Sequence, residues 1–279
     1  MELDGSFWGP AEGTLSKKIV FLHGMGGVGK LWRPIAALLE DHYRIFAPDQ
    51  RGHGRSRVFS GSGSLDLPSY TPLDYGQDLV DTLEISRFHP TWVVGHSMGV
   101  RSACAFAQLR PEWVRGLVLI DLGFDGPAGG GLGDALARFL QKLPSTFATR
   151  AEARSFMALE CPDPAIAQYL MAVSELDPLS GAVRFPFDHS ALIETIHAAR
   201  DSSVRSQVRA LGMRRKPILV LRGANSLVWS HEEYEREKSL FSDSPSVRFL
   251  EIESAGHGLP FERRAEFVKV LREFIEAGK

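Results

Sequence analysis

Short apolar runs and longer amphipathic stretches alternate along most of this chain. Apart from the last, the runs lack polar alternation, which is typical of strands in a parallel sheet covered on both faces. They span Ile19 to Leu22, Arg44 to Ala47, Trp92 to Val94, Leu117 to Ile120, Ile218 to Leu221 and Val247 to Ile252. Helical patterns between them include Gly76 to Ile85, Ser97 to Leu109 and Glu262 to Ile275. We therefore predict an α/β fold with a doubly wound, mostly parallel sheet.

This alternation stops between Asp121 and Lys216, where the pattern predicts no strand. A glycine-rich turn opens the segment, and short amphipathic helices follow, roughly at Asp134 to Leu143, Arg150 to Glu160, Ala165 to Leu176 and Ser190 to Arg200. We interpret the segment as an inserted helical lid. The predicted core covers residues 1–123 and 213–279, and the predicted lid covers residues 124–212. We expect 61–64, Gly-Ser-Gly-Ser, to be a surface loop rather than a domain boundary, because core patterns continue on both sides.

The strongest chemical signal is Gly95-His96-Ser97-Met98-Gly99, which stands between a predicted strand and a predicted helix. A sharp turn from strand to helix lifts the central side chain clear of the sheet, and small residues two positions away let the neighbouring backbone pass. The sequence therefore presents Ser97 as a nucleophile.

A glycine-rich loop at 24–30, Gly-Met-Gly-Gly-Val-Gly-Lys, allows competing interpretations. It matches a phosphate-binding P-loop, and Leu117 to Asp121 resembles the apolar strand and aspartate that accompany such a loop. However, Leu31 stands where a hydroxyl should bind magnesium. The loop also matches a dinucleotide-binding fingerprint, with Asp49 about 20 residues further on. That interpretation leaves His23 and the turn at 51–54 without a role.

A third interpretation accounts for more residues at once. His23-Gly24 follows the first central strand, and the turn at 49–56, Asp-Gln-Arg-Gly-His-Gly-Arg-Ser, follows the next. The Ser97 motif and a late Gly256-His257-Gly258 complete the series. In order and spacing, these motifs resemble those of the α/β-hydrolase fold superfamily over nearly the whole chain.

A serine hydroxyl needs a general base within hydrogen-bond reach and a third group that orients the base. Of the nine histidines, His257 is the best candidate base, since small residues flank it in a loop after the final strand. We expect His23, His53 and His96 to have structural roles in positioning the backbone and in packing.

The acid departs from the usual pattern of the superfamily. Most relatives have an aspartate in the turn after the strand at Ile218 to Leu221, but this turn contains Asn225 and Ser226 and no carboxylate. Asp121 ends the preceding strand at the same carboxyl edge as Ser97, where open α/β sheets assemble their sites. A Gly-x-Asn-Ser turn with such an aspartate resembles a branch of small bacterial and mitochondrial carboxylesterases. We therefore predict Asp121 as the acid.

The resemblance also implies an oxyanion hole made by the backbone N–H groups of Met25 and Met98. Arg101 lies one helical turn beyond Ser97. It is a candidate for binding an acidic substrate, although a buried ion pair or a solvated helix face is the more common role for such an arginine.

Composition narrows the choice of partners. The 279 residues are 44% hydrophobic and 24% charged, with a net charge of −2, so nothing points to nucleic acid or an anionic membrane. No apolar run approaches the roughly 20 residues of a membrane helix, and the acidic N-terminus is unlike a signal peptide. Two distant cysteines, Cys104 and Cys161, indicate a reducing compartment. We expect a cytoplasmic monomer or homodimer.

We therefore predict a serine hydrolase that cleaves a small carboxylic ester through an acyl-enzyme and requires neither a metal nor an organic cofactor. Ser97 attacks, His257 transfers the proton and Asp121 orients His257. Thioesters, amides, lactones and carbon–carbon bonds are cleaved by the same groups and remain alternative substrates. A ligand receptor with little turnover, built on the same fold, is the alternative from a different class, and a P-loop nucleotide-binding protein is a remote one.

Overall fold

Seven strands form the central sheet of this computed structural model, which describes residues 1–10, 17–57, 69–126, 131–200 and 202–278. Their order is β1-β3-β2-β4-β5-β9-β10. The bounds are β1 (Gly5–Trp8), β2 (Lys17–Leu22), β3 (Tyr43–Pro48), β4 (Thr91–His96), β5 (Val114–Ile120), β9 (Ile218–Gly223) and β10 (Val247–Ile252). Only β1 is antiparallel to its neighbour. The predicted fold class and all six predicted strands are confirmed, and the predicted loop at 61–64 lies outside the described residues.

The edge strand β1 was not predicted. It is four residues long and half exposed along most of its length, so it carries no buried apolar run. Its pairing with β3, in which Gly5 lies opposite Pro48, depends on a contact distant in sequence.

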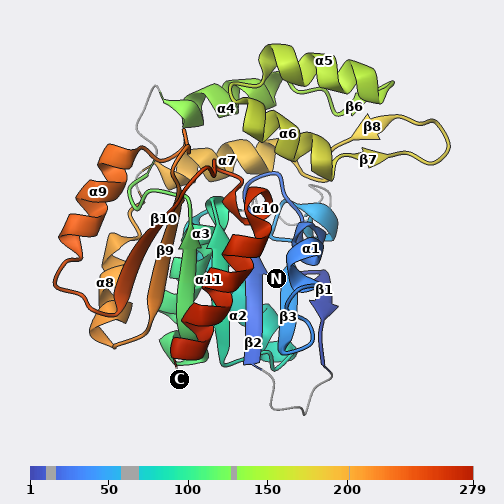
Figure 1. Cartoon of the computed structure of the whole chain (residues 1–279). Helices are drawn as coiled ribbons and strands as arrows, with labels where there is room; N and C mark the ends of the chain where they lie inside the picture. Colours follow the sequence, from blue (N-terminus) through green and yellow to red (C-terminus); the bar gives the residue numbers. More distant parts are fainter. Residues whose placement is uncertain (11–16, 58–68, 127–130, 201, 279) are drawn as a thin grey trace.

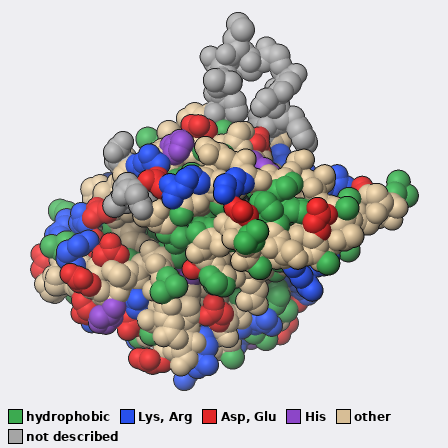
Figure 2. All heavy atoms as spheres, turned by 90° about the horizontal axis from the view of Figure 1, so that it is seen from above, with side chains coloured by type: hydrophobic (Ala, Val, Ile, Leu, Met, Phe, Trp, Pro, Cys, Tyr) green, Lys and Arg blue, Asp and Glu red, His purple; other side chains and the backbone are tan. Residues whose placement is uncertain are grey.

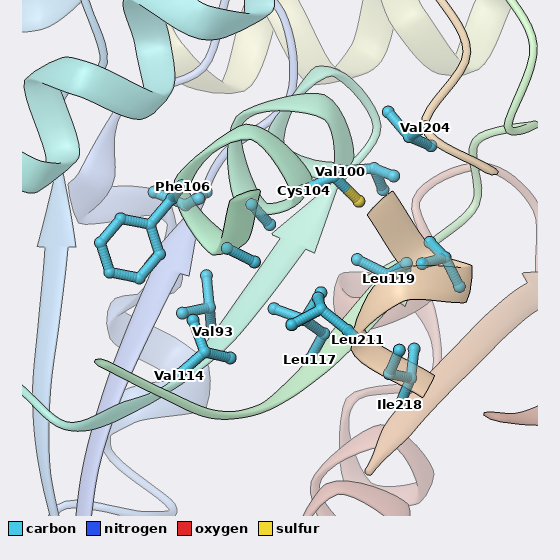
Figure 3. Close-up of a cluster of buried hydrophobic side chains, with 14 of the residues drawn as sticks. Val93, Val100, Cys104, Phe106, Val114, Leu117, Leu119, Val204, Leu211 and Ile218 are labelled. Carbon is cyan, nitrogen blue, oxygen red and sulfur yellow. The ribbon is translucent and has the colours of Figure 1, made fainter. Parts of the chain in front are cut away.

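Both faces of the sheet are buried, which explains the unbroken apolar runs. In β4, Val93 faces one core cluster, whereas Trp92 and Val94 face the other. Figure 3 shows the first cluster, where Val93 and Leu117 lie beneath α3. This face is covered by α2 (Pro72–Ile85), α3 (Met98–Leu109), α8 (Arg205–Met213) and α9 (His231–Leu240). The opposite face is covered by α1 (Arg33–Ala36), α10 (Leu259–Glu262) and α11 (Arg264–Ala277).

Short helices and caps shape the connections. Single 3-10 turns occur at η1 (Gly29–Trp32), η2 (Gly54–Ser56) and η3 (Pro111–Trp113). Helix α2 begins with a capping box, in which the Thr71 hydroxyl and the Asp74 carboxylate each bond the other's backbone N–H.

Both cysteines are free thiols, and burial raises the pKa of Cys104 to about 12. Among the described residues, no helix is long and apolar enough to cross a membrane.

The segment between β5 and α8 lies over the carboxyl ends of the strands (Figure 1). It contains α4 (Leu132–Lys142), β6 (Thr146–Phe147), α5 (Arg150–Glu160), α6 (Pro164–Val173), β7 (Glu175–Leu176), β8 (Val183–Arg184) and α7 (His189–Ala199). The expectation of no strand here is wrong, because β6, β8 and β7 pair into a three-stranded antiparallel sheet. Each strand has only two residues, too few to produce a periodic pattern.

We use the name lid for the segment between β5 and α8. Figure 2 shows hydrophobic side chains among charged ones on the face seen from above. In the lid, the side chains of Leu159 and Leu179 are 81% and 97% exposed. Helix α8, placed within the lid by sequence, instead buries Val208 and Leu211 in the sheet core. The division of the chain into domains stays a prediction, and this packing favours a lid that ends near residue 203.

Candidate active site

The turn between β4 and α3 holds Ser97 in a strained conformation, with φ 53° and ψ −123°. The close approach of neighbouring backbone explains both flanking glycines. A Cβ at Gly95 would lie 2.3 Å from the carbonyl oxygen of Gly99, and one at Gly99 would lie 2.5 Å from that of Leu22. The steric reason given above for these glycines is confirmed.

Ser97, His257 and Asp121 form one hydrogen-bonded chain, although they come from three separate segments. Nδ1 of His257 lies 2.7 Å from Oδ2 of Asp121, and Nε2 lies 3.0 Å from Oγ of Ser97. An ionised carboxylate only accepts hydrogen bonds, so Nδ1 carries the proton and Nε2 is free to accept the serine proton. The carboxylate is fully buried, whereas the His257 side chain is 14% exposed.

The Asp121 carboxylate has two further donors. Oδ1 accepts from the N–H of Gly223 at 3.0 Å, and Oδ2 accepts from the Ser226 hydroxyl at 2.5 Å. The sequence analysis considered Ser226 only as a residue that stands where most relatives have the acid. Its position in the turn after β9 was the signal for its role as a hydrogen-bond donor to Asp121. Asn225 contributes a backbone bond to the carbonyl oxygen of Ala255 at 2.8 Å.

In the loop after β2, the carbonyl of Gly24 and the N–H of Gly26 have hydrogen-bond partners within the protein, whereas the N–H of Met25 has none among the described residues. The carbonyl oxygen of Gly24 accepts from Gly27 N at 3.0 Å and from His23 Nδ1 at 2.8 Å. The N–H of Gly26 donates to Nε2 of His53 at 3.0 Å. Within the described part of the chain, no hydrogen bond uses the N–H of Met25 or Met98. These are the two donors that the sequence predicted for an oxyanion.

Three buried histidines hold the backbone around the site. Burial lowers the pKa of His23 to about 4 and that of His53 and His96 to about 3, so all three are neutral at neutral pH. Nε2 of His23 accepts from the N–H of Gln50 at 3.0 Å. Nε2 of His96 donates to the carbonyl oxygen of His257 at 2.7 Å, which fixes the loop of the candidate base. Among the residues that the structure describes, Nδ1 of His96 has no hydrogen-bond partner.

The phosphate-binding interpretations of the glycine loop are wrong. The buried Asp49 carboxylate accepts from Gly29 N at 2.7 Å and from Arg55 N at 3.0 Å, so it is occupied within the loop. The N–H groups of Gly26 and Gly27 are also bonded internally and cannot cradle a phosphate. The side chain of Lys30 is exposed, and its Nζ lies 3.5 Å from Oε1 of Glu175.

Arg101 binds the chain itself. Its guanidinium donates to the carbonyl oxygens of Asp125, at 2.6 Å, and Ser202, at 3.1 Å. Asp125 lies near the start of the lid and Ser202 near its end, so the buried Arg101 ties both ends of the lid to α3. Beside this link, the N–H of Val204 donates to the carbonyl oxygen of Phe124 at 2.8 Å. The acidic-substrate role considered for Arg101 therefore has no support in its contacts.

No group of three or more His, Cys, Asp or Glu side chains in the described ranges is arranged to hold a metal ion. The arrangement around Ser97 instead suits acyl transfer, since it combines a partly exposed serine, a base and two N–H groups that have no partner among the described residues.

Comparison with known proteins agrees with this fold. The family model described as alpha/beta hydrolase fold matches residues 17–263. The chain belongs to the α/β-hydrolase fold family. Within this family, the 2-(acetamidomethylene)succinate hydrolase of Mesorhizobium japonicum is 27% identical over 263 residues, which are 93% of this chain and 88% of that protein.

Solved structures show the same fold as this α/β hydrolase. A marine microorganism esterase superposes with a TM-score of 0.78 at 21% identity, covering 98% of this chain and 99% of the other. The enol-lactonase from Burkholderia xenovorans LB400 gives a TM-score of 0.74 at 19% identity, covering 98% of this chain and 96% of the enol-lactonase. The chain is thus a hydrolase by family, and its relatives act on several kinds of substrate.

Proposed function

We propose that this hydrolase cleaves carboxylic esters through a serine acyl-enzyme. The observation that carries the proposal is the unbroken hydrogen-bond chain from Oγ of Ser97 through His257 to the buried carboxylate of Asp121. Such a chain supplies a nucleophile, a base and a group that stabilises the charged base.

In the first half of the reaction, Oγ of Ser97 attacks the acyl carbonyl carbon while Nε2 of His257 takes its proton. The carbonyl oxygen becomes an oxyanion, which accepts from the N–H groups of Met25 and Met98. Each such donor accounts for about 10² to 10³ in rate. The imidazolium, stabilised by Asp121, then gives its proton to the departing alcohol, and the acyl group remains on Ser97.

In the second half, His257 takes a proton from a water molecule that attacks the acyl-enzyme. The tetrahedral intermediate collapses, the carboxylic acid leaves, and the proton returns to Oγ of Ser97. Every proton is transferred by His257, so the reaction needs no metal or organic cofactor.

An ester is the first substrate class to test, because the glycine–asparagine–serine turn at 223–226 resembles that of small carboxylesterases. The name of one structural neighbour, a marine microorganism esterase, agrees with this choice. Lactones, thioesters, amides and carbon–carbon bonds require the same groups and form the comparison panel. The enol-lactonase neighbour and the succinate-derivative hydrolase justify their inclusion.

The proposal is tested with a fluorophosphonate probe and a series of aryl esters of increasing acyl length. Ser97→Ala and His257→Ala should each lower kcat by roughly 10³ or more, and the double variant should be hardly worse, since the residues act as a unit. Ser97→Ala should also abolish labelling while the melting temperature stays within a few degrees. Losses that multiply in the double variant would contradict a shared mechanism, and tight ligand binding without turnover would identify a receptor.

A further inference from the structure

Side chains of the lid fill the space beside the glycine turn at 24–27. A Cβ at Gly26 would lie 2.5 Å from Cδ2 of Leu170, and one at Gly27 would lie 2.1 Å from the Tyr169 hydroxyl. Both distances are too short for real atoms, so α6 packs directly on the backbone of the turn. These two glycines of the loop that imitates a phosphate-binding loop therefore leave room for side chains of the lid.

The Tyr169 hydroxyl is the polar part of this contact. It donates to the carbonyl oxygen of Gly24 at 3.5 Å, a long hydrogen bond to the atom that already accepts from Gly27 and His23. Burial raises the pKa of this hydroxyl, which keeps it a protonated donor. The centroid of the Tyr169 ring lies 6.4 Å from that of His96, the residue that precedes Ser97.

The carbonyl of Gly24 and the N–H of Met25 belong to one peptide unit. Because a trans peptide is planar, its carbonyl oxygen and its N–H point in opposite directions and turn together. Donors that hold the Gly24 oxygen therefore also set the direction of the Met25 N–H, which the proposed mechanism uses to bind the oxyanion.

We propose that Tyr169 is a positioning residue, carried by the lid, that aims the Met25 N–H at the oxyanion through the carbonyl of Gly24. This inference rests on the proposed function of Met25. It means that docking of α6 on the turn adds a third donor to the Gly24 oxygen, so the lid contributes to the chemical step.

Tyr169→Phe removes the hydroxyl and keeps the ring. Because one neutral hydrogen bond of three on this carbonyl is lost, we expect kcat for an aryl ester to fall about three- to tenfold, with KM nearly unchanged. Tyr75→Phe is the matched control, since the Tyr75 hydroxyl also joins core to lid, through Thr195 at 2.7 Å, and has no described hydrogen bond to the turn. The Tyr75 ring, which packs in one cluster with Met98 and Met25, is kept in this variant. Equal losses of kcat in the two variants, or no loss in Tyr169→Phe, would overturn the proposal.

A second test uses the steric contact at Gly27. Apart from the Tyr169 hydroxyl at 2.1 Å, the nearest atoms to a Cβ at Gly27 are the Gly24 oxygen at 3.0 Å and Cβ of His23 at 3.1 Å. Gly27→Ala should therefore reduce kcat strongly in the wild-type background and about tenfold less in the Tyr169→Phe background. Residues in contact show such coupling, whereas independent residues add. Additive losses would contradict the inference.

Hydrogen exchange separates this inference from the proposed function. The N–H of Gly27 donates to the same Gly24 oxygen, so a loosened turn exposes it to solvent. Peptides covering residues 23–29 should exchange several-fold faster in Tyr169→Phe than in Tyr75→Phe, whether or not any ester is cleaved. Unchanged exchange in this segment would overturn the inference. If the exchange behaves as expected but the wild-type protein turns over no acyl donor, the proposed function is refuted and only the ordering of the turn by Tyr169 stands.

Discussion

The hydrogen bonds of Asp121 make its replacement by asparagine a sharp test of the acid. Oδ2 accepts from Nδ1 of His257 and from the Ser226 hydroxyl, while Oδ1 accepts from the N–H of Gly223. If the asparagine NH₂ group replaces Oδ2, Nδ1 of His257 must accept, which places the proton on Nε2 and blocks proton transfer from Ser97. The other orientation sets the NH₂ group against the N–H of Gly223.

The expected loss for Asp121→Asn is 10² to 10⁴ in kcat, because the wrong tautomer is favoured and the charge opposite the imidazolium is removed. The corresponding change in a serine protease costs about 10⁴. At about 1.4 kcal/mol for each tenfold change, this is roughly 3 to 6 kcal/mol of transition-state stabilisation.

The assay is kcat with a saturating aryl ester, together with the melting temperature of each variant. Asn225→Ala is the control and should cost much less, because the Asn225 contact described above is made by its backbone. In the Asp121→Asn background, Ser226→Asp should restore part of the rate, since the Ser226 hydroxyl lies 2.5 Å from the lost oxygen. Equal kcat for Asp121→Asn and the wild type would refute Asp121 as the acid.

Two further predictions concern the glycine loop and its histidines. Lys30→Ala should leave esterase activity nearly intact, and ATP with magnesium should not shift the melting temperature, whereas a ligand at 100 times its Kd would stabilise by about 2.7 kcal/mol. Burial lowers the pKa of His53 from 6.5 to about 3, so as the pH falls the unfolded chain takes up the proton first. The contribution of neutral His53 to the free energy of unfolding is therefore complete above pH 6.5 and is lost toward pH 3. Between these values the free energy of unfolding falls by up to about 1.4 kcal/mol per pH unit. Urea unfolding of the wild type and His53→Gln at pH 7 and pH 5 measures this slope, and equal slopes would contradict the assignment.

The sheet and the Ser97 turn could be predicted because their signals are local. A strand buried on both faces needs an unbroken apolar run, and a turn in which Gly95 and Gly99 touch passing backbone accepts no larger residue. The choice of Asp121 required one further step, the knowledge that strand ends meet at one edge of the sheet.

The remaining contacts could not be predicted because they depend on where the lid folds back. Nothing near Tyr169 in the sequence indicates that its hydroxyl reaches Gly24, 145 residues away. The spacing that places Arg101 one turn beyond Ser97 is equally compatible with a substrate contact and with the observed bonds to Asp125 and Ser202. Pairing of the two-residue strands in the lid likewise appears only in three dimensions.

Because Arg101 bonds both ends of the lid, the distance between these ends does not depend on the length of the segment between them. Asp125 and Ser202 stand near the two ends of the lid, and the guanidinium of Arg101 on α3 donates to the carbonyl oxygens of both. The entropic cost of closing a loop between fixed ends grows only with the logarithm of its length, so segments of very different size fit the same base. We therefore expect lid segments of other lengths to fit between these two points without moving Ser97.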